Sequence, residues 1–245
     1  MAAGLLQQIV STLEQGGLDL RALGLGWARA APVVAIVPAF GLRAVPAPVR
    51  AIMGLAMAAA IAPSVGADPS MASRGWLAAL GVSFAQGLPI AIAAAIPLWA
   101  ATMAGGVIDA VRGTSETVSM PPIEGRPTPL GVPMALLAST IFLGTGGPAR
   151  VASALASPSQ VPGSMALMRA SLDLASGVNI ALAVAAPVLA SSIVIEIGAA
   201  LVARAAAPAQ IHALLAPMRS LGILAITAFL LDRMAGFVAL AVHAR

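Results

Sequence analysis

The residue types that support catalysis are scarce in this chain of 245 residues. It contains nine acidic residues, thirteen basic residues that are all arginine, two histidines and no cysteine. His212 and His243 are 31 residues apart, so neither a histidine-rich nor a cysteine-based metal site is expected. A nucleophile–base pattern, a phosphate-binding loop and an HExxH motif are also missing from the sequence. We therefore expect no enzyme, no catalytic, cofactor-binding or metal-binding residues, and no cofactor.

Two charged residues stand close enough in sequence to form a local ion pair. Asp109 and Arg112 are three positions apart, so their side chains meet on one face of a helix. We interpret the pair as the anchor of a turn; contact with a water-filled passage and a proton relay are the alternatives. Asp232 and Arg233 are adjacent and lie on different helix faces, which indicates contact with protein or water.

The polar stretch "GGVIDAVRGTSETVSMPPIEGRP" (105–127) interrupts strongly apolar sequence. It follows the 34 residues 75–108, which carry no charge. Gly113 allows the backbone to leave a helix, and the serines and threonines after it suit a wet passage better than lipid. Non-helical backbone at membrane depth is tolerated only where it is buried in protein or lines water. The stretch is therefore a candidate for a functional loop.

The composition is that of an integral membrane protein. Hydrophobic residues make up 60%, charged residues 9%, and the mean hydropathy is +0.98, whereas soluble domains carry roughly a quarter charged residues. The net charge of +4 comes from single, scattered arginines, and aromatic residues make up only 3%. This distribution argues against nucleic-acid binding.

The long apolar stretches of the sequence predict an all-α membrane protein with about six apolar helical zones in one domain, 1–245. A bilayer crossing needs about 20 apolar residues. Pro89 and Pro97 are expected to kink or split the third zone. The glycine-rich "GTGGP" (144–148) is expected to give a helix break or close packing. The last two zones form a C-terminal helical hairpin. The zones are 21–41, 47–63, 75–108, 130–155, 173–203 and 209–243.

Several separated motifs, in colinear order over roughly residues 21 to 243, together resemble one family. It is the FliR/SctT (YscT/SpaR/HrcT-like) family of export-gate proteins in bacterial type III secretion systems. The motifs are "PAFGLRAVPAPVR" (38–50), "GGVIDAVRG" (105–113), "TPLG" (128–131), "IFLGTGG" (141–147), "SPSQVP" (157–162) and "ARAAAPAQIHALLAPMRSLG" (203–222). The "IDAVRG" text and the Ser-Pro loop resemble the injectisome branch more than the flagellar one.

The resemblance implies a multi-pass gate subunit in the bacterial inner membrane, lying partly above the bilayer plane. Residues 21–156 resemble a SctR-type subunit and 165–245 a SctS-type hairpin. The implied partners are SctR/FliP-like and SctS/FliQ-like subunits, a SctU/FlhB-like switch protein, a SctV/FlhA-like export protein, membrane lipid and unfolded secreted substrates. The alternatives are a flagellar FliR protein and a small secondary transporter.

The resemblance also assigns roles to residues. Residues 113–127 would form a plug-like gating loop, anchored by Asp109 and Arg112. The gating-loop residues are Gly113, Thr114, Ser115, Glu116, Ser119, Met120, Pro121, Pro122, Glu124 and Arg126. The expected assembly and interface residues are Arg43, Pro46, Arg50, Glu196, Arg204, Pro208 and Arg219.

Overall fold

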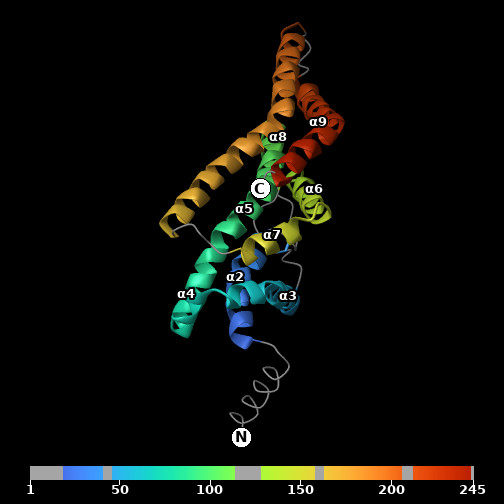
Figure 1. Cartoon of the computed structure of the whole chain (residues 1–245). Coiled ribbons are helices and arrows are strands. Elements are labelled where there is room, and N and C mark those ends of the chain that lie inside the picture. The colour runs from blue at the N-terminus through green and yellow to red at the C-terminus, as the bar shows by residue number, and fades with distance from the viewer. Residues whose placement is uncertain (1–18, 41–45, 114–127, 158–162, 206–211, 244–245) are drawn as a thin grey trace. The chain divides into compact units, whose positions relative to one another are not determined.

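Helices are the only regular elements in the part of the chain that the structure, a computed structural model, describes: residues 19–40, 46–113, 128–157, 163–205 and 212–243 (Figure 1). This confirms the predicted all-α membrane fold, and each predicted apolar zone contains a helix. The helices are α2 (Leu20–Ile36), α3 (Ala47–Gly66), α4 (Pro69–Ala72), α5 (Trp76–Val111), α6 (Gly131–Gly144), α7 (Gly147–Ala156), α8 (Gly163–Ala205) and α9 (His212–His243).

Four helices are long and apolar enough to cross a bilayer. These are α3, α5, the Met168–Ala205 part of α8 and the Leu215–His243 part of α9. A fifth span is possible if the bent pair α6 and α7 crosses as one unit. Little of the backbone in such helices is left without a hydrogen-bond partner, which is the condition for stability in lipid.

Helix α5 is continuous over 36 residues, so the predicted splitting of this zone is wrong. Pro89 and Pro97 both lie inside it. Each proline removes one backbone N–H, which costs the helix one hydrogen bond. A complete break would leave several more polar backbone groups without partners, at a much higher cost in apolar surroundings. The helix therefore tolerates both prolines.

The helix break predicted at "GTGGP" is confirmed. Helix α6 ends at Gly144, α7 begins at Gly147, and the two axes are bent by 64°. Gly146 has φ +75°, a left-handed conformation that side chains with a Cβ rarely adopt. Pro148 then occupies the first turn of α7, where a missing N–H is harmless.

The described helices form two compact units, and α5 and α8 each contribute to both. Unit 1 contains residues 1–95 and 146–174. In this unit α2 (blue) lies beside α3 (cyan) (Figure 1), and α7 also packs on α3. A Cβ on Gly26 would lie 2.9 Å from the backbone oxygen of Ala58, so only glycine permits this close approach of α2 to α3. The buried side chains Leu25, Val33, Ile61, Val65 and Leu155 belong to the core of this unit.

Unit 2 contains residues 96–145 and 175–245. Its core includes Ile108 of α5, Phe142 of α6, Val184 of α8, and Ile223 and Met234 of α9. Helix α6 packs against α9, and α8 meets α9 closely, because a Cβ on Gly222 would lie 3.4 Å from the Ile195 side chain. This unit positions the polar cluster described next.

Candidate functional site

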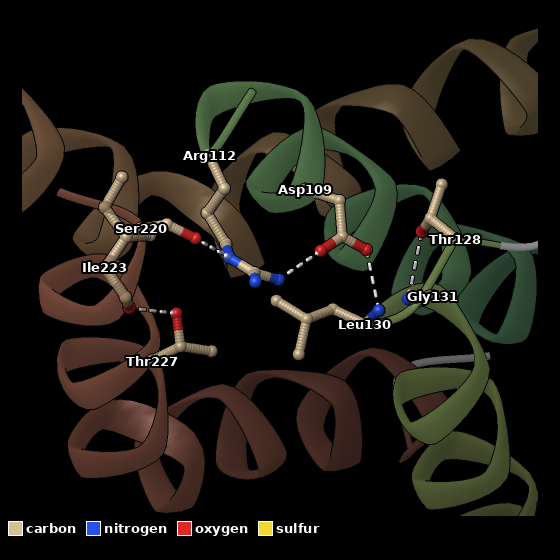
Figure 2. Close-up of polar contacts among 8 residues, drawn as sticks. All are labelled: Asp109, Arg112, Thr128, Leu130, Gly131, Ser220, Ile223 and Thr227. Carbon is tan, nitrogen blue, oxygen red and sulfur yellow. Dashed lines mark hydrogen bonds and ion pairs between the residues drawn. The ribbon is translucent and has the colours of Figure 1, made fainter. Parts of the chain in front are cut away.

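A buried carboxylate lies at the end of α5, in unit 2. Asp109 is fully buried, and both of its carboxylate oxygens accept hydrogen bonds (Figure 2). Arg112 Nη1 donates to Oδ1 at 2.8 Å. The backbone N–H of Leu130 donates to Oδ2 at 2.6 Å. Asp109 therefore ties the last turn of α5 to the residue that precedes α6.

The start of α6 is fitted closely to α5 at this point. The hydroxyl oxygen of Thr128 accepts a hydrogen bond from the Gly131 N–H at 3.1 Å, which satisfies one of the free N–H groups at the helix N-terminus. A Cβ on Gly105 would lie 2.6 Å from the Leu130 carbonyl oxygen. Gly113, at the other end of this junction, has φ +74°. The residues on either side of segment 114–127 are thus held together.

Helix α9 holds the same end of α5. Arg112 Nε donates to the hydroxyl of Ser220 at 3.3 Å (Figure 2). Arg219 Nη2 donates to the carbonyl oxygen of Val111 at 3.0 Å and forms an ion pair with Glu196 of α8. A cation at the last carbonyl of a helix complements the negative end of its dipole. Three helices of unit 2 therefore meet at one polar cluster: Asp109, Arg112, Glu196, Arg219 and Ser220.

The cluster becomes more exposed away from Asp109. The exposed fraction of the side chain is 0% for Asp109 and 10% for Arg112, and it rises to 37% for Arg219 and 49% for Glu196. Solvent screens the outer pair much more than the inner one. The Asp109–Arg112 pair is therefore the stronger contact.

The predicted Asp109–Arg112 pairing is confirmed, whereas its role as a loop anchor stays a prediction. Glu196 and Arg219, both expected at an assembly interface, pair with each other within the chain. Arg204 is exposed near the end of α8, Arg50 is half-buried in α3, and Pro46 is the exposed residue before α3. The residues that lie outside the described ranges are Arg43, Thr114, Ser115, Glu116, Ser119, Met120, Pro121, Pro122, Glu124, Arg126 and Pro208.

A second buried polar contact, in unit 1, was not assigned from sequence. Arg29 of α2 is only 3% exposed. Its Nη1 donates to the Leu155 carbonyl oxygen at 3.1 Å, in the last turn of α7, and its Nη2 contacts Gln86 Oε1 of α5. In the sequence, the one feature that points to this contact is a single arginine within an apolar stretch. Nothing in the sequence marks Gln86 or a backbone carbonyl as its partner.

Metal chemistry finds no support in the described ranges, where no group of three or more acidic or histidine side chains is placed to hold an ion. What the structure offers is a set of apolar helices long enough for several membrane crossings and a buried polar junction between the end of α5 and the start of α6. Such an arrangement defines a multi-pass α-helical membrane protein.

Comparison with known families identifies the class more closely. The family model described as "Bacterial export proteins, family 1" matches residues 20–244. The chain therefore belongs to this family of FliR/SctT-type bacterial export proteins. Its members are structural proteins of the export apparatus, so this chain is a membrane component of a bacterial protein-export complex. No curated protein sequence matches the chain.

Proposed function

We propose that this protein is the SctT subunit of a type III secretion export gate of the injectisome branch, located in the bacterial inner membrane. Its membership of the family of export proteins supports the gate role. The "IDAVRG" sequence (108–113) and the Ser-Pro loop (157–162) support the injectisome branch over the flagellar one. Together with SctR- and SctS-like subunits, it forms the closed channel through which unfolded proteins leave the cytoplasm.

The partners follow from the same proposal. Residues 21–156 take the place of a SctR-like subunit in the assembly, and 165–245 that of a SctS-like hairpin. The SctU/FlhB-like switch protein and the SctV/FlhA-like export protein work beside this gate. Arg43, Pro46, Arg50, Arg204 and Pro208 contribute to contacts between subunits.

Residues 113–127 act as the gating loop, which closes the passage at rest. The observation that carries this role is the buried carboxylate of Asp109, which binds Arg112 before the loop and the Leu130 N–H after it. A segment that must block a passage and then move needs a fixed base, and Asp109 supplies one. The loop itself brings hydroxyl side chains that suit water, with Met120 as a flexible apolar seal.

Deletion of residues 114–127 tests the gating role. In the intact export complex, the deletion is expected to raise small-solute leakage across the inner membrane while the complex still assembles. Leakage is measured by uptake of a small, normally excluded solute, and assembly by co-purification of the partner subunits. Normal assembly without any rise in leakage would remove the gating role.

A matched control separates loss of the loop from damage to its base. Replacing 114–127 by a polar glycine–serine segment of equal length keeps Asp109, Arg112 and Leu130 in place. It is expected to leak as the deletion does, because it lacks Met120 and the Pro121–Pro122 pair. A replacement that seals as well as the natural sequence would assign the seal to the length of the loop alone.

A further inference from the structure

Helix α9 cannot cross a bilayer without carrying charge into it. A crossing takes about 20 residues. The charge-free stretches of α9 are 212–218, 220–231 and 234–243, and all three are far shorter than this. Every 20-residue window of the helix therefore contains Arg219 or the pair Asp232 and Arg233. That pair lies near the middle of the otherwise apolar stretch 221–242.

Arg219 and the Asp232–Arg233 pair differ in how their charges are neutralised. Arg219 has Glu196 and the Val111 carbonyl oxygen as partners in unit 2. Asp232 and Arg233 are both exposed, and neither has a hydrogen-bond or ion-pair partner in the portion of the chain that the structure describes. No described residue therefore neutralises the charges at Asp232 and Arg233.

The pair borders the outer, apolar face of α9. Met234 and Val238 on the opposite face are buried in unit 2. Successive helix positions turn by roughly 100°, which places Asp232 along one edge of the outer face and Arg233 along the other. Between them lies an apolar strip, in which Phe229 is 87% exposed and Leu240 is 68% exposed. We call this strip with its two charges the outer face of α9.

Neither lipid nor water suits this face. A carboxylate at bilayer depth is costly in lipid, and the side chain of Asp232 is too short to reach the headgroup region, unlike a long arginine side chain. Water would solvate the charges but leave Phe229 and Leu240 exposed to it. A protein surface can cover the apolar strip and also bring an opposite charge to each edge.

We propose that the outer face of α9 binds a helix of another subunit of the membrane export complex. That helix presents a small or apolar strip to Phe229, a basic side chain to Asp232, and an acidic or carbonyl oxygen to Arg233. The proposal rests on membership of an export complex and on the position of the charges in α9. It does not depend on the gating loop or on the secretion branch.

Charge-specific variants in the full complex provide the first test. Asp232→Asn removes the charge and keeps the size, and it is expected to lower recovery of the bound subunit about tenfold or more. Asp232→Glu, the matched control, retains the charge and should retain binding. The amount of this chain in the membrane should stay unchanged in both variants, because Asp232 has no partner within the described chain. Full recovery with Asp232→Asn would overturn the proposal.

Two probes identify what covers the face. A photo-crosslinking residue at position 229 in the assembled complex is expected to join this chain to another membrane subunit. Because the chain has no cysteine, the single variant Leu240→Cys, which keeps both charges of the outer face, can be tested with a membrane-impermeant maleimide, and the complex should protect it. Crosslinks to lipid alone or within this chain, or rapid labelling of the thiol, would overturn the proposal. None of these readouts involves leakage through the gate, so failure here is distinguishable from failure of the gating role.

Discussion

Asp109 illustrates how a charge is kept inside an apolar protein. It is fully buried, and burial of a lone carboxylate is so unfavourable that the group would normally take up a proton. Here Arg112 supplies the opposite charge and the Leu130 N–H a second hydrogen bond. Removing one member of such a pair costs more than the pair contributes, because the remaining charge stays buried.

The two members of this pair should therefore respond unequally to substitution. Arg112→Met removes the positive charge that pairs with the fully buried carboxylate, and we expect it to lower the free energy of unfolding by about 3–5 kcal/mol. Asp109→Asn keeps an oxygen for the Leu130 N–H and leaves the partly exposed Arg112 with Ser220, so a loss of about 1–3 kcal/mol is expected.

Denaturant unfolding of the purified protein in detergent measures both variants. The double variant provides the control, because it contains neither charge and should lose less than the sum of the single losses. A larger loss for Asp109→Asn than for Arg112→Met would contradict this account of the burial.

At the scale of helices, the junction of α5 with α6 depends on one of two neighbouring glycines. A Cβ on Gly105 would lie 2.6 Å from the Leu130 carbonyl oxygen and 2.7 Å from the Gly131 backbone. These are backbone atoms, which cannot rotate away. A Cβ on Gly106 would meet only Thr128 side-chain atoms, at 3.8 Å and beyond, which is an ordinary contact.

Gly105→Ala should therefore separate the two helices, and Gly106→Ala serves as its matched control. Overpacking of this kind costs about 1–3 kcal/mol. Gly106→Ala should be neutral or stabilising by about 0.5–1 kcal/mol, because alanine has the higher helix propensity. Thermal unfolding in detergent gives both values. Equal stability of the two variants would mean that the junction can relax around an added methyl group.

At the scale of the whole chain, the features that rest on local sequence were predictable. Long apolar runs predicted the helical zones, the glycines at 144–147 predicted the break, and the spacing of Asp109 and Arg112 predicted their pairing. The remaining contacts join residues that packing alone brings together. Arg219 contacts Glu196 and Val111, which are 23 and 108 positions away. The bond from the Leu130 N–H to Asp109 comes from the backbone, so no residue type in the sequence marks it. Of the two outcomes predicted for the prolines of α5, a kink or a split, the split is wrong because apolar surroundings penalise a complete break.

The proposed assignment to the injectisome branch applies to the whole protein, and it is tested in the bacterium that carries the gene. Deletion of the gene should abolish secretion through the injectisome and leave flagellar motility unchanged, because the subunit belongs to the first apparatus only. Secretion is measured by the appearance of substrates in the culture medium. A plasmid copy of the gene must restore it. Loss of motility with normal injectisome secretion would assign the protein to the flagellar branch.

The contact between Arg29 and the Leu155 carbonyl oxygen has a consequence for biogenesis. The two residues are separated by 126 positions. At a synthesis rate of about 5–20 residues per second, roughly 6–25 s pass between their emergence from the ribosome. Gln86 follows Arg29 by 57 positions, so the guanidinium of Arg29 first lacks both partners and then has only Gln86 to bind until α7 is made. Unit 1 therefore stays incomplete until the first part of unit 2 has been made, and the machinery that inserts the chain must hold an arginine that the finished protein buries.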